Sequence, residues 1–217
     1  MKKNGVVYWI CGLAGSGKTS VAEKFSLVLR KKGIKPVLLD GDYIRESFDL
    51  PKDYSYEGRK KIARIYSKMT KMLSDQGFTV VVSVIAMYEE VFLFNRKNIK
   101  NYVEVFLDVP LDELAKRNKK KLYSNFYEGK TKNIVGLDIK AEFPKNPDII
   151  LNNYGNKTVQ DCVNDLTGFH ENLEKINNVK KKNNQSTLDM KQISLRLISE
   201  FNDLKRTPIS VSKELNF

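Results

Sequence analysis

The sequence predicts an α/β protein with a doubly wound, mostly parallel five-stranded sheet, helices on both faces and a C-terminal helical tail. Five short apolar runs have the length and composition of buried strands. Stretches with a helical spacing of apolar residues separate these runs. Strands that alternate with helices form parallel sheets, because each crossover returns the chain in the same direction. A glycine-rich loop also follows the first run directly and precedes a helical pattern.

The predicted strands are rich in β-branched and aromatic residues, which suit a sheet covered on both faces. The third run, Phe-Thr-Val-Val-Val-Ser-Val-Ile, is almost continuously apolar and leaves no side for solvent. We expect strands at residues 6–10, 36–40, 78–85, 103–109 and 148–152.

The predicted helices carry apolar residues three and four positions apart, and Gly33 and Gly77 end two of them. Pro110 opens another helix. Two segments without this pattern are predicted to be a functional loop, at residues 43–58, and a long lid rich in Lys, Asn and Gly, at residues 118–147. We expect the remaining helices after the glycine-rich loop as far as Gly33 and at residues 59–76, 89–100 and 158–176.

The domain organisation changes near residue 178. We expect one domain at residues 1–177 and a linker with a helical tail at residues 178–217. The segment 180–187 is polar, whereas residues 188–204 have the spacing of an amphipathic helix. Docking of this helix on the domain and binding to a partner both remain open.

Composition excludes several classes of protein. No apolar run of the 217 residues approaches the ~20 needed to span a bilayer, and the N-terminus leads directly into the first strand, so we expect a cytoplasmic protein without a membrane partner. Cys11 and Cys162 are expected to be reduced thiols. With His170 as the one histidine, a histidine-based metal cluster or catalytic triad is not expected. The net charge is +12, but the lysines are scattered, so a nucleic-acid partner is not favoured.

Residues 12–19 read Gly-Leu-Ala-Gly-Ser-Gly-Lys-Thr, which is the phosphate-binding pattern G-x-x-x-x-G-K-[ST]. Its glycines allow the backbone N–H groups to turn towards a phosphate. Lys18 supplies a positive charge for the outer phosphates, and the Thr19 hydroxyl is placed to bind Mg²⁺. The pattern therefore predicts a nucleoside triphosphate and Mg²⁺ as ligands, and the family resemblance described below implies that the triphosphate is ATP. The predicted ATP-binding residues are Gly12, Leu13, Ala14, Gly15, Ser16, Gly17, Lys18, Thr19 and Ser20.

Asp40-Gly41-Asp42 follows the second predicted strand, at the same edge of the sheet as the phosphate loop. A carboxylate at this place can accept the proton of an attacking hydroxyl or help to hold Mg²⁺. Asp and Gly are equally common in simple turns, so spacing alone leaves both interpretations open.

Taken together, these motifs resemble the adenylylsulfate kinase family. The shared elements are the phosphate loop and Leu39-Asp40-Gly41-Asp42-Tyr43-Ile44-Arg45, followed by Arg59, Gly77, Lys120-Lys121-Leu122-Tyr123, Gly136-Leu137-Asp138 and Pro144 to Asp148. The likeness covers roughly residues 5 to 175. It implies transfer of the γ-phosphoryl group of ATP to the ribose 3′-hydroxyl of adenosine 5′-phosphosulfate.

The resemblance also implies roles for individual residues. Asp42 matches the base for the 3′-hydroxyl, so Asp42, Lys18 and Lys120 are the expected catalytic residues, with Lys120 in the lid. Arg45 and Arg59 match arginines that hold the anionic 5′ group, which suits guanidinium chemistry. The expected acceptor-binding residues are Asp40, Asp42, Arg45, Tyr54, which would stack on the base, Arg59, Ile85 and Lys120.

Departures from the family pattern gather on the acceptor side. Ala86 replaces a serine, which excludes a phosphoserine intermediate at this position. Ile62 replaces an asparagine, and Ile134 stands where the family has an aromatic residue that sandwiches the base. Two further changes are Glu89 and Phe92, each at a position where the family has arginine. Because a lost stacking or amide contact costs about 1–3 kcal/mol, these changes point to a different acceptor nucleotide.

The resemblance extends to adenylylsulfate-kinase-like proteins of bacterial capsule pathways, which phosphorylate a cytidine diphosphoramidate on its 3′-hydroxyl. Adenosine 5′-phosphosulfate and a cytidine diphosphoramidate-type acceptor therefore both remain open. Two other classes also remain: an ATP-binding module with a decayed acceptor site, and a nucleic-acid 5′-hydroxyl kinase suggested by the charge of +12. Family members often form homodimers, although no residue of this sequence identifies a dimer interface.

Overall fold

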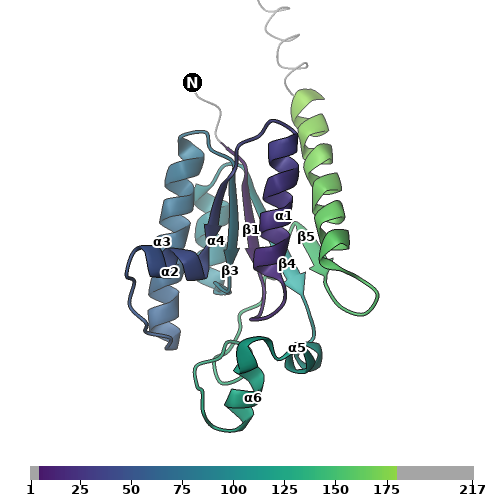
Figure 1. Cartoon of the computed structure of the whole chain (residues 1–217). Coiled ribbons are helices and arrows are strands. Elements are labelled where there is room, and N and C mark those ends of the chain that lie inside the picture. Colours follow the sequence, from purple (N-terminus) through teal and green to yellow (C-terminus); the bar gives the residue numbers. More distant parts are fainter. Residues whose placement is uncertain (1–4, 180–217) are drawn as a thin grey trace, which may run out of the picture. The chain divides into compact units, whose positions relative to one another are not determined.

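The centre of the protein is a five-stranded sheet in the strand order β2-β3-β1-β4-β5 (Figure 1). This computed structural model describes residues 5–179, except the side chain of Lys120. Every strand pair is parallel, which confirms the predicted fold class. All five predicted strands are present, each with ends within two residues of the prediction: β1 Val7–Cys11, β2 Val37–Asp40, β3 Val80–Val84, β4 Tyr102–Asp108 and β5 Ile149–Asn152.

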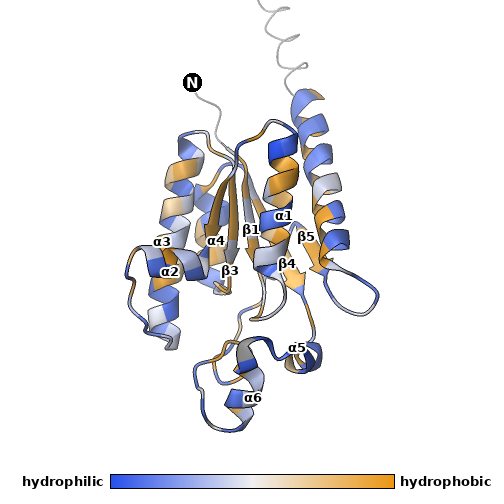
Figure 2. Ribbon diagram, viewed as in Figure 1, coloured by the Kyte–Doolittle hydropathy of each residue, from blue (hydrophilic) through white to orange (hydrophobic). Residues whose placement is uncertain are grey.

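The two inner strands β1 and β3 are buried at every position. Their register pairs Val7 with Val80, and Val7 also pairs with Tyr102 on β4. Strands covered on both faces need apolar side chains on both faces, and Figure 2 shows the sheet as the most hydrophobic part of the ribbon. Burial of this apolar surface is the main term that stabilises the fold.

The helices form two layers, because right-handed crossovers in opposite directions place their helices on opposite faces of a parallel sheet. Helix α1 lies over one face, whereas α3 and α4, which contact each other, cover the other (Figure 1). Ser55 caps α3 by accepting a hydrogen bond from the Gly58 N–H at 3.1 Å. The predicted helices are observed as α1 Lys18–Lys31, α3 Tyr56–Asp75, α4 Glu89–Asn98, α5 Leu111–Arg117 and a final helix at residues 159–179.

The prediction of a continuous loop at residues 43–58 is wrong at both ends, because Gly41–Ser47 forms helix α2 and α3 already begins at Tyr56. Asp40 caps α2 with its carboxylate, which accepts hydrogen bonds from the N–H groups of Asp42 and Tyr43. Such a cap satisfies N–H groups that have no partner within the helix. Ile44 is the one buried residue of α2, so the apolar periodicity was too weak to predict it.

The predicted lid at residues 118–147 is largely irregular, as expected, but it contains a 3₁₀ turn, η1, at Lys119–Lys121 and helix α6 at Leu122–Tyr127. Asn118, Lys121 and Asn133 have positive φ angles of 39°, 55° and 64°. Such left-handed residues interrupt a helix, because a Cβ crowds the backbone in that conformation. The lid therefore contains only short helical segments, separated by irregular chain.

The chain divides into two compact units, residues 1–169 and residues 170–217. Cys162, Val163 and Leu166, at the start of the final helix, are buried in the first unit. Both cysteines are free thiols, as predicted. The predicted tail helix at residues 188–204 lies outside the described residues, and the predicted boundary between residues 177 and 178 stays a prediction.

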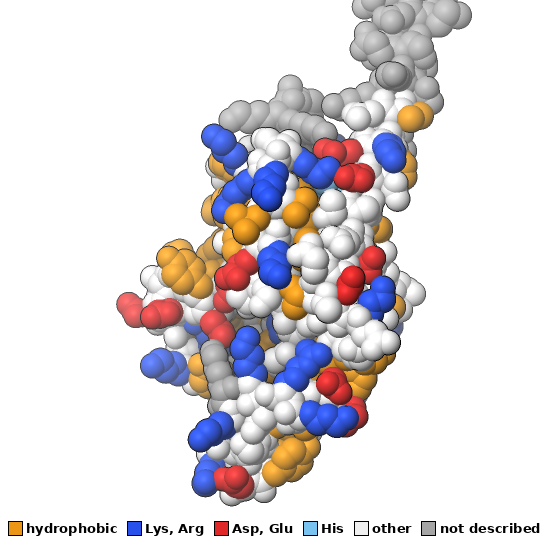
Figure 3. All heavy atoms as spheres, turned by 45° about the vertical axis from the view of Figure 1, so that its right-hand side comes forward, with side chains coloured by type: hydrophobic (Ala, Val, Ile, Leu, Met, Phe, Trp, Pro, Cys, Tyr) orange, Lys and Arg blue, Asp and Glu red, His pale blue; other side chains and the backbone are white. Residues whose placement is uncertain are grey.

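Two findings concern residues 5–179 only. No helix in this range is long and apolar enough to cross a membrane. The same range contains no group of three or more His, Cys, Asp or Glu side chains that could hold a metal ion. Figure 3 shows Lys and Arg side chains spread over the visible face and mixed with acidic ones, in line with the scattered lysines of the sequence.

Candidate functional site

The phosphate loop connects β1 to α1, as the sequence predicts. Gly15 and Gly17 have φ angles of 80° and 100°, where a side chain would strain the backbone. At Gly12 an added Cβ would lie 2.5 Å from the Leu107 carbonyl oxygen on β4, so only glycine fits. The loop thus has the backbone conformation that its glycines predict.

Lys18 begins α1, and its ammonium group is turned back onto the phosphate loop. Its Nζ donates a hydrogen bond to the Leu13 carbonyl oxygen at 2.8 Å. The side chain is 8% exposed, and burial lowers the pKa of Lys18 from 10.5 to about 8. Asp42 and Asp40 oppose this change, so both carboxylates lie within electrostatic reach of the ammonium group. An anionic phosphate at the loop would favour the charged lysine in the same way.

Thr19 and Asp40 lie together although they are 21 residues apart in the sequence. Thr19 Oγ1 donates a hydrogen bond to Asp40 Oδ2 at 2.8 Å, and it lies 3.4 Å from the Ser83 hydroxyl on β3. A hydroxyl beside a carboxylate is a pair of hard oxygen donors, which is the chemistry that Mg²⁺ prefers. These residues therefore fit the magnesium ion predicted at Thr19.

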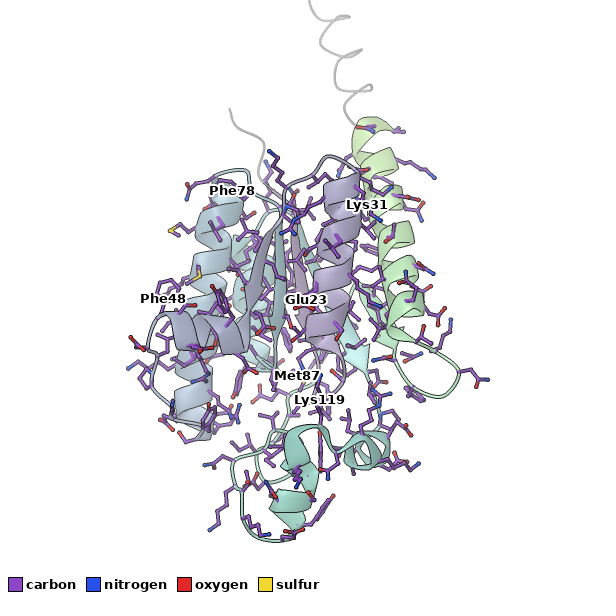
Figure 4. The ribbon with its side chains drawn as sticks, viewed as in Figure 1. Glu23, Lys31, Phe48, Phe78, Met87 and Lys119 are labelled. Carbon is purple, nitrogen blue, oxygen red and sulfur yellow. The ribbon has the colours of Figure 1, made fainter. Side chains whose placement is uncertain are left out.

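The lid contacts the phosphate loop at two points. The Tyr123 hydroxyl on α6 donates a hydrogen bond to the Ala14 carbonyl oxygen at 2.9 Å. A Cβ at Gly136 would lie 2.8 Å from Leu13 Cδ2, so the lid backbone packs directly on the loop. Lys119 belongs to the same region, since a Cβ at Gly15 would lie 3.8 Å from Lys119 Cβ, and Figure 4 shows Lys119 beyond the end of the sheet.

Apart from the phosphate loop, a hollow lies beside Asp42 at the carboxyl ends of β2 and β3. It is a cavity of about 60 Å³, and its lining includes Asp42, Arg45, Tyr54, Arg59, Ile85 and Tyr88. Five of the residues predicted to bind the acceptor thus line one cavity. Asp40, a sixth, lies at its edge through the cap of α2.

Arg45 and Arg59 lie against the ring of Tyr54, with guanidinium carbons 5.1 and 4.9 Å from the ring centre. Arg45 Nη1 donates to the Pro51 carbonyl oxygen at 2.8 Å. Arg59 donates Nε to the Tyr54 carbonyl oxygen and Nη2 to the Asn133 carbonyl oxygen of the lid, both at 2.9 Å. Among the described residues, neither guanidinium forms an ion pair with a carboxylate. Two adjacent positive charges therefore face this cavity uncompensated by an ion pair.

Arg59 is partly buried, and this burial lowers its pKa. The neighbouring charge of Arg45 acts in the same direction. Two like charges held this close, with one partly desolvated, favour the binding of an anion between them.

Several departures from the family pattern belong to the hydrophobic core. Ile62 and Phe92 are 3% and 7% exposed, and both pack in the main apolar cluster. Glu89 forms an ion pair with Lys145 at 2.5 Å. Ile134 is buried as well, at 3% exposure. Packing thus accounts for Ile62 and Phe92, and a local ion pair accounts for Glu89.

Sequence reasoning missed residues that the fold brings to the site. Asn153, after β5, donates Nδ2 to the Ser16 carbonyl oxygen of the phosphate loop at 2.8 Å and accepts a hydrogen bond from Arg117. Tyr66 and Tyr88 line the cavity beside Asp42. The sequence signal for Tyr66 is its helical spacing, four residues after Ile62, which places the two on one side of α3. The side chain of Lys120 lies outside the described part of the chain, and its role stays a prediction.

Comparison with known proteins agrees with this arrangement. Residues 4–152 match the adenylylsulphate kinase family. The chain is 36% identical over 165 residues to a cytidine diphosphoramidate kinase of Campylobacter jejuni, covering 75% of this chain and 95% of the relative. It is 32% identical over 176 residues to an adenylyl-sulfate kinase of Picosynechococcus, covering 81% and 93%.

Solved structures show the same relationship. A Mycobacterium tuberculosis APS kinase, determined in complex with AMPPNP and APS, superposes with a TM-score of 0.70 at 32% identity. The match covers 77% of this chain and 98% of that one. The protein therefore belongs to the adenylylsulphate kinase family and is a phosphotransferase with an alcohol group as acceptor.

Proposed function

We propose that this protein transfers the γ-phosphoryl group of ATP to the ribose 3′-hydroxyl of a nucleotide whose 5′ group is anionic. The observation that carries the proposal is the position of Asp42. It lines the cavity that holds Arg45 and Arg59, and it lies within electrostatic reach of Lys18 in the phosphate loop. A carboxylate between a phosphate site and an anion site is suited to activate a hydroxyl held between them.

In the proposed reaction Asp42 accepts the proton of the 3′-hydroxyl. The 3′-oxygen forms a bond to the γ-phosphorus, and the bond from that phosphorus to the β,γ-bridging oxygen breaks, so that ADP leaves. Lys18 and the loop N–H groups stabilise the negative charge that develops on the phosphates. Mg²⁺ at Thr19 supplies further charge neutralisation when bound. Lys120 of the lid is proposed to act on the same phosphates.

Acceptor binding is proposed to use the cavity beside α2. Arg45 and Arg59 bind the anionic 5′ group, and Tyr54 and Ile85 contact the rest of the nucleotide. A 5′ group with two acidic centres suits two adjacent guanidinium groups, since each forms paired hydrogen bonds with oxygen atoms. This anion preference fits both candidate acceptors.

Between the two acceptors we favour a cytidine diphosphoramidate-type nucleotide. Ile134, buried where the family has an aromatic ring, leaves the base with one fewer stacking partner. The loss is greater for a purine than for a pyrimidine, because the larger ring system has more stacking surface. Similarity to the Campylobacter jejuni cytidine diphosphoramidate kinase supports the same choice. A role in capsule modification in the cytoplasm follows from this acceptor as part of the proposal.

Adenosine 5′-phosphosulfate is the second candidate, supported by the similarity to adenylyl-sulfate kinases. Purified protein with ATP and Mg²⁺ should be assayed against both acceptors, with ADP release as the readout. The site of phosphorylation is then located by phosphorus NMR and by acceptors that lack the 3′-hydroxyl. We expect turnover with the cytidine acceptor and none with its 3′-deoxy form. ADP release that depends on oligonucleotides, or ATP binding without transfer to either acceptor, would overturn the proposal.

A further inference from the structure

Tyr88, directly before α4, has a buried hydroxyl without a hydrogen-bond partner. The residue is 3% exposed, and its Oη contacts neither solvent nor any donor or acceptor. Buried polar groups are almost always paired, because an unpaired one has lost its water without compensation. Several other buried hydroxyls among the described residues also lack a partner, but Tyr88 is the one of them that lines the cavity beside Asp42, where a ligand can supply the missing contact.

The two neighbouring tyrosines show the contrast. The Tyr56 hydroxyl donates to Glu142 Oε1 at 2.7 Å, and the Tyr66 hydroxyl donates to the Gly41 carbonyl oxygen at 2.8 Å. Tyr56 also packs edge-to-face against the ring of Tyr88, with centroids 5.3 Å apart. Packing thus holds the Tyr88 ring in place, while its hydroxyl alone remains unused.

The surroundings of this hydroxyl favour an anion. Tyr88 lines the same cavity as Arg45 and Arg59, and the charge of Arg59 is the strongest electrostatic influence on its hydroxyl. Burial nevertheless raises the pKa of Tyr88 to about 12, so the group stays a protonated donor at neutral pH. A protonated hydroxyl beside two guanidinium groups offers a third hydrogen-bond donor to a negatively charged group.

The size of the cavity agrees with this function. A buried water needs roughly 10–15 Å³ of such space, so the 60 Å³ present has room for several oxygen-sized atoms. The space beside Tyr88 thus matches one acidic group of a ligand. The cavity opens to solvent, so the ribose and base of a bound nucleotide can extend outward from it.

We propose that the Tyr88 hydroxyl is a third ligand of the acceptor's anionic 5′ group and completes a site with Arg45 and Arg59. The inference rests on the proposed function for the identity of the ligand, a nucleotide with an acidic 5′ group. A ligand without that group gains nothing from Tyr88.

The kinetic test compares Tyr88→Phe with Tyr56→Phe. Each change removes one hydroxyl and keeps the ring. For Tyr88→Phe we expect the KM for the acceptor to rise about 10- to 100-fold, as for a lost hydrogen bond to a charged group, with kcat and the KM for ATP nearly unchanged. Its Tm should not fall, because the hydroxyl has no partner in the free protein. Tyr56→Phe should lower Tm and leave the KM for the acceptor unchanged.

A binding test does not depend on turnover. With the phosphate loop saturated by ADP and Mg²⁺, calorimetry compares cytidine 5′-diphosphate with cytidine, and adenosine 5′-monophosphate with adenosine. We expect Tyr88→Phe to weaken binding of the charged ligand of a pair and leave the uncharged one unaffected. Equal binding by wild type and variant, an equal loss for both ligands, or no preference of the wild type for the charged ligands would each overturn the inference. Charge-dependent loss in a protein that phosphorylates neither acceptor would instead refute the proposed function and leave the anion site standing.

Discussion

Thr19 Oγ1 and Asp40 Oδ2 are joined by a hydrogen bond of 2.8 Å that links the phosphate loop to the start of α2. Because Asp40 also caps α2 through its other carboxylate oxygen, one side chain positions both the predicted magnesium ligand and Asp42. Binding of ATP at the loop and placement of the proposed base are therefore mechanically connected.

Replacing Asp40 by Ala should lower the free energy of unfolding by about 1 kcal/mol through loss of the cap. It should also raise the Mg²⁺ concentration needed for half-maximal activity, because an oxygen donor beside Thr19 is lost. Urea unfolding and a magnesium titration measure the two effects. Asp112→Ala on α5, whose ion pair with Lys116 is exposed, is the control and should change neither. A fully stable Asp40→Ala protein would contradict the capping role.

Replacing Asp42 by Asn should lower kcat by about 10²- to 10⁴-fold, since the amide keeps the shape of the side chain but cannot accept the proton. Stability and ATP binding should remain close to wild type. Steady-state kinetics and a nucleotide titration provide the measurement. Glu46→Gln removes a neighbouring exposed charge on the same helix and serves as the matched variant. If Asp42→Asn retains full activity, Asp42 is not the base.

Lys18 should make the nucleotide-free protein more stable as the pH rises from about 8 to 10.5. The pKa of this lysine is lowered in the folded protein, so above pH 8 the folded state releases a proton that the unfolded chain keeps. Stability rises with pH wherever the unfolded state binds more protons. At pH 7 the free energy of unfolding of Lys18→Met should therefore be about 3 kcal/mol higher than that of the wild type. This difference should vanish near pH 10.5.

Urea unfolding between pH 7 and pH 10 measures this difference. Lys24→Met, at an exposed position of α1, controls for loss of a positive charge and should show no such trend. If the difference in unfolding free energy between Lys18→Met and wild type is the same at pH 7 and at pH 10, the buried ammonium group is not its source.

Glu142, in the lid, should contribute stability that is lost in acid. Its carboxylate accepts hydrogen bonds from the Glu89 N–H at 2.6 Å and from the Tyr56 hydroxyl, and these lower its pKa below 4.5. A carboxyl group whose pKa is lowered by folding stabilises the protein above pH 4.5. This stabilisation disappears as the pH falls through the pKa that the group has in the folded protein. Glu142→Gln should cost about 1 kcal/mol at pH 7 and progressively less below pH 4.5.

Unfolding at pH 7 and at low pH tests this prediction, and a double-mutant cycle with Tyr56→Phe isolates the hydrogen bond. Non-additive effects of the two changes are expected at pH 7. Fully additive effects would mean that the contact does not contribute to stability.

Most of the sheet could be predicted, because runs such as residues 78–85 have no face that could meet solvent. Helix α2 could not, since Ile44 is its one buried residue and a single apolar position gives no helical periodicity. The positions of Ile62 and Phe92 in the hydrophobic core could not be predicted from the sequence either. A change from a polar to an apolar residue looks the same whether the side chain borders a ligand or packs in the core.

The sequence by itself determined the phosphate loop and the strand–loop–helix unit around it, because glycine conformation, apolar runs and helix spacing act between residues close together in the chain. Only the tertiary structure decided which distant side chains meet there. Thr19 with Asp40, Arg59 with Asn133, and Tyr88 beside both arginines come together through the parallel register of the strands and the path of the lid. Such contacts depend on how whole helices and strands pack together, and the local sequence patterns do not determine that packing.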